Sequence, residues 1–296
     1  MPENSSGWPD RVSISSALTA ATVLLARAGV ASARGDAELI AAAVLKIPRG
    51  RLALSSGFNH IDLDRFDELV SRRAAREPLQ YLTGSAPFRY LELAVGPGVF
   101  VPRPETELLA GAGIDALRAG GGGLLIDLCS GSGAIALSAA HEVPVARVVA
   151  VERSAASLSW LRRNARRRAE AGDRPIEVVA GDVTDPQLLA GLSGQADVVL
   201  CNPPYVPAGT PVPPEVAGHD PDDAVFGGPD GLVVIRPVIR LAATLLRPGG
   251  VFGIEHDDSH AAAVAGLIAA DARFTKVTSH RDLADRHRYV TADRAG

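Results

Sequence analysis

The residues LLIDLCSGSG, numbers 124–133, carry the clearest fold signal in this chain. Their first half is an apolar run with the length of a buried strand, and the apolar segment 134–140 that follows them reads as a helix. Glycines in such a strand-to-helix turn allow a tight bend and a close approach of backbone to a ligand. The stretch therefore predicts the first unit of an α/β sheet, with a ligand site where the strand ends.

Strands and helices alternate over the rest of the chain. Further strands are predicted at 147–151, 176–180, 196–201, 251–255, 275–278 and 288–291, with helices between most of them. Nearly continuous apolar strands that alternate with helices favour a parallel sheet covered on both faces. The link 279–287 is too short for a parallel crossover, so the last strand should be antiparallel. The prediction is an α/β, doubly wound, Rossmann-like sheet of seven strands.

The chain before Pro78 has a different texture and is predicted to form a small helical domain. Its expected helices are 13–31, 37–47 with Asp36 as N-cap, and one from Asp62 or Asp64 to about Arg76. Strand-like segments at 80–82 and 88–95 predict a linking β-hairpin. The expected domains are therefore 1–77, a hairpin linker at 78–104, and 105–296.

Bulk composition excludes several classes of protein. The net charge of −4 does not favour a protein that lives on nucleic acid, which normally needs a basic face. The two cysteines leave no disulfide framework and no metal cluster, which fits a reducing, cytoplasmic setting. No apolar run reaches the roughly 18–20 residues of a membrane span, and the polar first ten residues lack a signal-peptide pattern.

Acidic residues follow the first three predicted strands of the sheet. Asp127 ends the first strand, Glu152 the second about 20 residues later, and Asp182 with Val183 follows the third. An acid after the second strand suits ribose hydroxyls, and an acid beside an apolar residue after the third suits an adenine ring. Asp127 would suit the ammonium of an amino-acid cofactor and would repel a pyrophosphate. These strand ends predict a nucleoside site.

Asn202-Pro203-Pro204-Tyr205 follows the apolar strand 196–201. Neither proline has an N–H to donate, so the ladder ends there, and the residue before a proline is held in extended geometry. The result is a stiff turn that presents an amide, carbonyl groups and an aromatic ring, which suits gripping a planar –NH2 group. The segment 202–231 that begins at this turn lacks clear elements and is predicted to be a substrate loop.

These motifs resemble a known family. Residues 127–133 look like the first motif of S-adenosylmethionine-dependent class I methyltransferases, and with residues 202–205 they resemble enzymes that methylate adenine N6, cytosine N4 or glutamine N5. The segments REPLQYLTG (76–84) and VPRPETE (101–107) narrow the resemblance to the peptide chain release factor N5-glutamine methyltransferases, over about residues 10–292.

The resemblance implies a substrate, a cofactor and a set of roles. The substrate would be the glutamine of the Gly-Gly-Gln motif in class I release factors, and the enzyme a cytoplasmic monomer whose N-terminal domain docks the substrate. Residues of the cofactor site would be Asp127, Cys129, Ser130, Gly131, Ser132, Gly133, Glu152, Asp182, Val183 and Asn202. Asn202, Pro203, Pro204 and Tyr205 would line the amide slot. The family often has Gly at 129, Asp at 152 and an aromatic residue near 183.

Two other functions are compatible with parts of the pattern. A DNA or RNA adenine-N6 methyltransferase could use the same turn on a flipped base, but it would want a basic cleft. The N-terminal segment instead carries acids at Asp36, Glu38, Asp62, Asp64, Asp67 and Glu68. A cofactor-binding protein that docks without catalysis is the third possibility, and the intact Asn-Pro-Pro-Tyr turn argues against it.

Overall fold

The computed structural model of the protein describes residues 11–296 and divides into two compact units. The first unit holds the chain up to Gly84 together with Pro213–His219, and the second holds Ser85–Val212 and Asp220–Gly296. The first ten residues, on which the expected absence of a signal peptide rests, lie outside the described residues.

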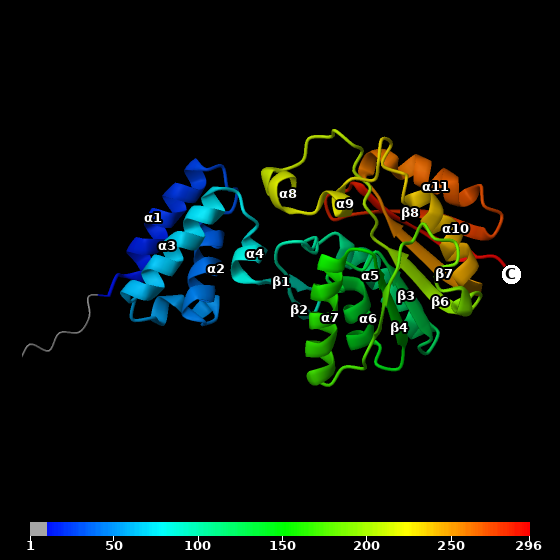
Figure 1. The fold of residues 1–296 in the computed structure, drawn as a ribbon, viewed down its shortest axis with the longest axis horizontal. Helices are drawn as coiled ribbons and strands as arrows, with labels where there is room; N and C mark the ends of the chain where they lie inside the picture. The colour runs from blue at the N-terminus through cyan, green and yellow to red at the C-terminus, as the bar shows by residue number, and fades with distance from the viewer. Residues whose placement is uncertain (1–10) are drawn as a thin grey trace, which may run out of the picture. The chain divides into compact units, whose positions relative to one another are not determined.

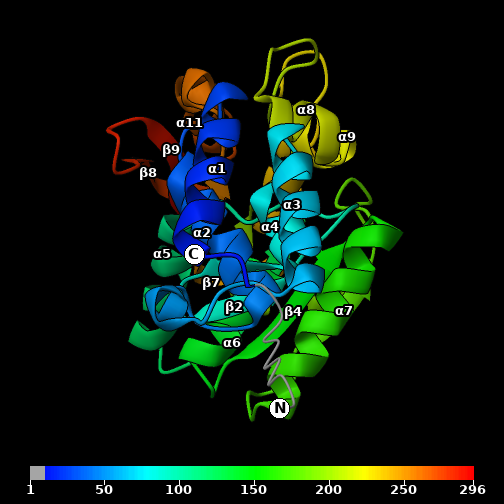
Figure 2. The same ribbon diagram turned by 90° about the vertical axis from the view of Figure 1, so that its left-hand side faces the viewer.

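The first unit is helical. Its three longer helices lie side by side in Figure 2: α1 (Ile14–Arg27), α2 (Ala33–Leu45) and α3 (His60–Ala74). The short helices are η1 (Arg49–Leu54), α4 (Leu79–Thr83) and α8 (Pro214–His219). The core is apolar and includes Phe58 and Phe66, whose rings stack 4.9 Å apart and are shielded from solvent. Burial of these faces, rather than helix propensity, stabilises such short helices.

Two local predictions in this unit are wrong. Helix α2 begins at Ala33, so Asp36 is not its N-cap; the carboxylate lies buried in the first turn and accepts a hydrogen bond from Arg73 Nε at 2.8 Å. The predicted strand 80–82 is the helix α4, which ends at Gly84 in the left-handed conformation (φ 77°). In both places a tertiary partner or a turn outweighed the local pattern.

The second unit contains the sheet. It opens with the hairpin β1 (Ser85–Phe88) and β2 (Leu91–Ala94), whose turn falls at Arg89-Tyr90, inside the segment that was expected to be one strand. Seven further strands form one sheet in the order β5-β4-β3-β6-β7-β9-β8 (Figure 1). They are β3 (Leu124–Leu128), β4 (Arg147–Glu152), β5 (Glu177–Ala180), β6 (Ala196–Cys201), β7 (Leu246–Glu255), β8 (Phe274–Arg281) and β9 (His287–Arg294). Because β9 runs antiparallel to both β7 and β8, the predicted sheet of seven strands with an antiparallel last strand is confirmed.

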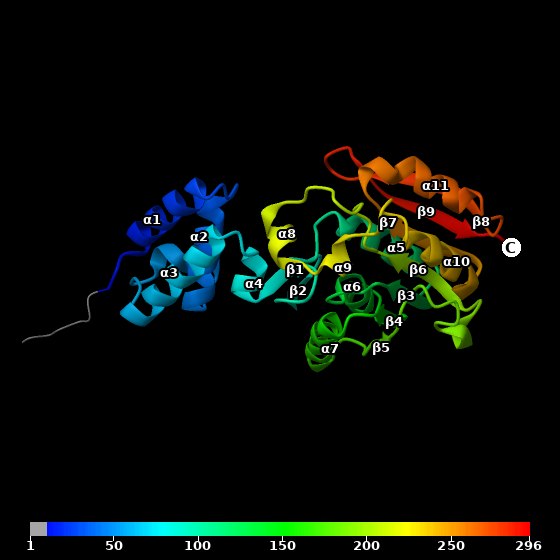
Figure 3. The ribbon, with the colours of Figure 1, turned by 45° about the horizontal axis from the view of Figure 1, so that its top comes forward.

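Helices cover both faces of this sheet, as Figure 3 shows. Helices α5 (Thr106–Ala119), α6 (Ala134–Glu142) and α7 (Ala155–Glu170) pack on one face, and α10 (Ile235–Leu245) and α11 (Ala261–Ala269) on the other. Successive residues of β3 alternate between the two cores: Leu125 joins the first, while Ile126 and Leu128 join the second. A strand buried on both faces needs an apolar residue at nearly every position, which is the pattern read from the sequence.

The order of strands in the sheet indicates where a ligand should bind. The chain passes from β3 outward to β4 and β5, then returns to the other side of β3 with β6 and β7. The carboxyl ends of β3 and β6 therefore flank the point where the strand order reverses, which is where open α/β sheets bind ligands. The segment 202–231 is not devoid of regular structure, because it carries α8 and α9 (Asp222–Val225). Single-turn 3-10 helices also occur at η2 (Ala190–Leu192) and η3 (Asp258–His260).

Candidate active site

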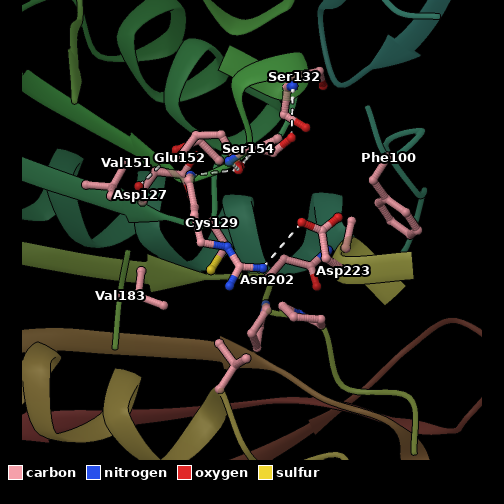
Figure 4. Close-up of a pocket in the computed structure, with 18 of the residues that line it drawn as sticks. Phe100, Asp127, Cys129, Ser132, Val151, Glu152, Ser154, Val183, Asn202 and Asp223 are labelled. Carbon is pink, nitrogen blue, oxygen red and sulfur yellow. Dashed lines mark hydrogen bonds and ion pairs between the residues drawn. The ribbon is translucent and has the colours of Figure 1, made fainter. Parts of the chain in front are cut away.

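A cavity lies at the carboxyl ends of β3, β4, β5 and β6, and all of its lining belongs to the second unit (Figure 4). The structure brings nearly all of the predicted site residues to this cavity. Those that line it are Asp127, Cys129, Ser130, Gly131, Ser132, Glu152, Asp182, Val183, Asn202, Pro203, Pro204 and Tyr205. Gly133 is not among the lining residues.

Gly133 shapes the loop from behind. It starts helix α6 with φ 91°, and a Cβ there would lie 2.6 Å from Leu161 Cδ1 and 2.9 Å from Leu137 Cδ1. Gly131 and Cys129 also have positive φ, at 55° and 62°. A left-handed conformation favours glycine because it strains a residue with a Cβ, so Cys129 carries backbone strain that a glycine at this position would avoid.

Asp127 is completely buried beneath this loop. Its Oδ2 accepts a hydrogen bond from the backbone N of Ala136 at 3.1 Å, while Oδ1 is buried with no hydrogen-bond partner in the described part of the chain. Burial raises the pKa of the Asp127 carboxyl to about 7, although hydrogen bonds from Ser130 and from the backbone N of Ala136 act to lower it. A buried acceptor without a partner is costly, so this oxygen suits a cationic ligand group.

Glu152 folds back onto the loop instead of reaching straight into the cavity. Its Oε2 accepts from Gly131 N at 2.9 Å, and its Oε1 accepts from the backbone N of Arg153 at 2.8 Å and of Ser154 at 2.7 Å. The carboxylate thereby ties the end of β4 to the glycine loop after β3. A carboxylate oxygen has two lone pairs, so Oε2 can still accept one hydroxyl.

Asp182 and Val183 follow β5 at another wall of the cavity. The Oδ1 of Asp182 accepts from both N and Oγ1 of Thr184 at 2.8 Å, and these hydrogen bonds lower the pKa of Asp182. The Val183 side chain is buried in the sheet core. Phe100 also lines the cavity, but Figure 4 shows it on the opposite side from Val183, so it does not supply an aromatic neighbour there.

Sequence reasoning missed an ion-pair group at this cavity. Arg153, the residue after β4, lies 3.4 Å from Asp182 and 3.3 Å from Asp223, and all three line the cavity, where Figure 4 labels Asp223. Asp223 belongs to helix α9 of the long segment after the Asn-Pro-Pro-Tyr turn. No local pattern indicates the contact between Arg153 and Asp223, because 70 residues separate them along the chain.

The turn at Asn202 is held by a chain of buried and partly buried hydrogen bonds. Asn202 Nδ2 donates to Thr106 Oγ1 at 3.1 Å, and Thr106 Oγ1 donates to Glu255 Oε2 at 2.7 Å. The hydroxyl of Tyr205 donates to Glu255 Oε1 at 3.0 Å. Sequence analysis did not place Thr106 or Glu255 in the site. The only signal for Thr106 was its position in the segment 101–107.

Two further observations concern the described residues taken together. Among residues 11–296, no group of three His, Cys, Asp or Glu side chains is arranged to hold a metal ion. Over the same range, every helix is too short or too polar to cross a membrane.

Comparison with known proteins gives the family. Residues 16–84 match the model of the PrmC N-terminal domain, and residues 104–213 match that of the methyltransferase small domain. The sheet, its strand order and the cavity at the switch point thus define an S-adenosylmethionine-dependent methyltransferase. A release factor glutamine methyltransferase of Mycolicibacterium smegmatis is 49% identical over 94% of this chain and 96% of its own. The chain belongs to the release factor glutamine methyltransferase family, as the sequence resemblance predicted.

Two other relatives are informative. The release factor glutamine methyltransferase of Mycobacterium tuberculosis is 45% identical over 95% of this chain and 91% of its own. A 4-amino-L-phenylalanine/4-methylamino-L-phenylalanine methyltransferase of Streptomyces pristinaespiralis is 39% identical over 90% of each chain. By their names the first acts on a glutamine of a release factor, and the second on 4-amino-L-phenylalanine and 4-methylamino-L-phenylalanine.

Proposed function

We propose that this protein transfers a methyl group from S-adenosylmethionine to the side-chain amide nitrogen of the glutamine in the Gly-Gly-Gln motif of class I release factors. One observation carries the proposal. The Asn202–Tyr205 turn and the loop after β3 line the same cavity, and the Nδ2 of Asn202 is committed to Thr106. The Oδ1 of Asn202 is therefore the atom left to accept a hydrogen bond from a substrate –NH2 group.

The cofactor site fits S-adenosylmethionine by its donor and acceptor groups. The unpartnered Oδ1 of Asp127 would take the ammonium group, and the remaining lone pair on Glu152 Oε2 would take a ribose hydroxyl. The backbone of residues 129–133 would approach the amino-acid part, with Asp182 and Val183 beside the adenine. When bound, the cofactor supplies a methyl group on a positively charged sulfur.

The residues of the turn would act on the glutamine amide. The Oδ1 of Asn202 and the carbonyl of Pro203 accept its two hydrogens and aim its nitrogen, while the ring of Tyr205 lines the slot. The amide nitrogen is a poor nucleophile, since its lone pair is delocalised into the carbonyl. Acceptors bind it more tightly as positive charge grows there during transfer, which stabilises the transition state more than the ground state. Once methylated, the amide nitrogen is cationic and acidic and releases one proton to water, so no general base is needed before attack.

The remaining expectations belong to the same proposal. The helical unit, whose family model covers 16–84, would dock the release factor, with functional boundaries at 1–77, 78–104 and 105–296. We expect a cytoplasmic monomer that does not bind nucleic acid directly. The net charge of −4 supports the last point, because a nucleic-acid surface would favour a basic protein.

Mass spectrometry of the release factor tests the proposal. The full-length protein is incubated with S-adenosylmethionine and unmodified release factor, and the Gly-Gly-Gln peptide is examined for one added methyl group on glutamine. The Asn202→Ala variant should lower kcat by about 100-fold or more with a much smaller change in cofactor affinity. Retention of near wild-type turnover in this variant would contradict the role of Asn202.

Three further substrates decide between this function and its alternatives. A duplex and a single-stranded DNA offered in parallel should stay unlabelled, and labelled adenine would instead support the nucleic-acid enzyme. Free 4-amino-L-phenylalanine is offered as well, because a relative at 39% identity is named for that substrate. Methylation of the aryl amine without methylation of the release factor would assign the protein to that second activity.

A further inference from the structure

Glu255 and Thr106 lie outside the Asn-Pro-Pro-Tyr turn, yet the hydrogen bonds of that turn end on them. We propose that these two side chains are positioning residues that fix the direction of the Asn202 amide, so that Oδ1 rather than Nδ2 faces the substrate. The inference rests on the proposed function, since it concerns how the same turn recognises an –NH2 group.

The number of protons available along this chain of hydrogen bonds determines which group donates at each step. An ionised carboxylate only accepts hydrogen bonds, and each hydroxyl has one proton to give. Thr106 and Tyr205 both give theirs to Glu255, at 2.7 and 3.0 Å. Thr106 Oγ1 then has only lone pairs left for Asn202, so the group that faces it at 3.1 Å must be the donor Nδ2. A flipped amide would set Oδ1 against Oγ1 with no proton between them.

Burial makes the other orientation of the Asn202 amide energetically costly. Glu255 is 1% exposed and Thr106, at the cavity wall, is 4% exposed, so little of either side chain is open to water that could supply a missing proton or a substitute acceptor. In a site of low dielectric an unmatched polar pair is costly, and a fully satisfied chain is rigid. The amide of Asn202 is therefore preorganised before a substrate arrives, which is what efficient transition-state stabilisation requires.

The side chains that form these hydrogen bonds come from a helix and a strand of the second unit, and not from loops alone. Thr106 is the first residue of α5, and Glu255 is the last residue of β7. Strand β7 pairs with β6 through Ile254 and Cys201, so Glu255 lies directly beside the start of the turn. Positions on rigid elements hold a site more precisely than loop positions do.

Protonation of Glu255 would remove the directing charge. Burial raises the pKa of Glu255 to about 7, and Glu105 also raises it, while hydrogen bonds from Thr106 and Tyr205 and the charge of Arg288 on β9 act to lower it. The buried thiol of Cys201 on β6 is the other titratable group that senses Glu255. A protonated Glu255 can donate to Thr106, whose own proton can then turn toward Asn202 and accommodate the flipped amide.

Kinetics with a matched pair of variants test the proposal. Thr106→Val keeps the shape of the side chain but removes the hydroxyl, whereas Thr106→Ser keeps the hydroxyl. Thr106→Val and Glu255→Gln should lower kcat on the release factor by about tenfold or more, with cofactor affinity within about twofold of wild type. Thr106→Ser should retain kcat. Wild-type kcat in Thr106→Val, or an equal loss in Thr106→Ser, would overturn the inference.

An NMR measurement without substrate separates this inference from the proposed function. The side-chain ¹⁵N–¹H₂ signals of Asn202, assigned by their loss in Asn202→Asp, are followed with pH in the presence of S-adenosylmethionine. They should shift with a midpoint near pH 7 in the wild type, stay constant in Glu255→Gln, and move in Thr106→Val but not in Thr106→Ser. Such behaviour in an enzyme that leaves release factor unmethylated would refute the proposed substrate alone. Signals indifferent to pH and to these variants would refute the positioning role, even if release factor is methylated.

Discussion

Asp127 illustrates how a single residue can be costly to the free protein and, in the proposed site, serve as a ligand for the cofactor. It is buried, one of its oxygens has no partner among the described residues, and its pKa is raised to about 7 by burial. Its ordinary value is 3.8, so the folded protein holds this proton between roughly pH 4 and 7 while the unfolded chain releases it. The associated stability is present at low pH and is lost as the pH rises toward 7.

Cofactor binding should therefore depend on pH in a defined direction. If the ammonium group pairs with ionised Asp127, binding below pH 7 must first expel a proton, and affinity should fall up to about tenfold per pH unit as the pH decreases. Isothermal titration of S-adenosylmethionine between pH 6 and 8 measures this. Asp127→Asn should bind weakly with no such slope, whereas Glu255→Gln should keep the slope. A flat profile in the wild type would remove Asp127 from this role.

Cys129 offers a second prediction at the scale of one residue. Its φ of 62° places a side chain with a Cβ in the left-handed region. Cys129→Gly should therefore be more stable than Cys129→Ala by about 1 kcal/mol, since both lack the thiol and only the alanine retains the strain. Urea unfolding of the two variants measures the difference. An alanine variant as stable as the glycine variant would show that the loop relaxes at no cost.

Among the elements, helix α8 is the least expected. It has six residues, it arises within the segment that follows the Asn-Pro-Pro-Tyr turn, and it belongs to the helical unit. Glu215 of this helix accepts from Arg76 Nε and Nη2, both at 2.8 Å, and from Arg73 Nη1 at 3.0 Å. Partial burial acts to raise the pKa of Glu215, but hydrogen bonds from the two arginines outweigh it and lower that pKa to about 2. A helix this short depends on such contacts.

Removing the charge of Glu215 should therefore loosen α8 selectively. In Glu215→Gln, amide hydrogen exchange over residues 213–219 should accelerate by about tenfold, because a neutral amide cannot satisfy both guanidinium groups. Glu68→Gln is the matched control, since Glu68 pairs with Arg65 and Arg72 on the exposed surface of α3. That variant should leave exchange in 213–219 unchanged. Equal exchange in both variants would mean that other contacts hold α8.

At the scale of the whole molecule, the chain consists of two compact units, and the cavity is lined by one of them alone. A ligand that binds only the folded state stabilises it by about 2.7 kcal/mol at a concentration 100 times its dissociation constant. This stabilisation should act mainly on the second unit, whose residues line the cavity.

Hydrogen exchange should reveal this division. S-Adenosylmethionine should slow exchange in β3, β4 and the loops after β3 and β6, and leave the core of α1–α3 unchanged. The product S-adenosylhomocysteine serves as a second ligand with the same expected pattern, because it lacks only the methyl group. Slower exchange throughout α1–α3 would show that the two units unfold as one.

Much of the structure of the second unit could be predicted from the sequence, because the patterns that indicate it involve residues close together along the chain. Apolar runs, the glycine turn at 124–133 and the proline turn at 202–205 each depend on residues adjacent along the chain, and the confirmed sheet follows from them. Two local predictions were wrong: helix α2 begins earlier than predicted, and residues 80–82, predicted as a strand, belong to helix α4. In the first, a buried ion pair of Asp36 with Arg73, 37 residues away, replaced the expected cap.

The order of strands and turns along the chain thus determined the fold and the positions of the glycine loop and of the Asn-Pro-Pro-Tyr turn, because backbone conformation there is dictated by neighbouring residue types. Tertiary structure alone decided which side chains support that turn. Thr106 lies 96 residues from Asn202 and 149 from Glu255, and no local pattern couples them. Only the packing of α5 against the sheet brings the hydroxyl, the carboxylate and the amide within hydrogen-bond distance, where burial makes the direction of each proton matter.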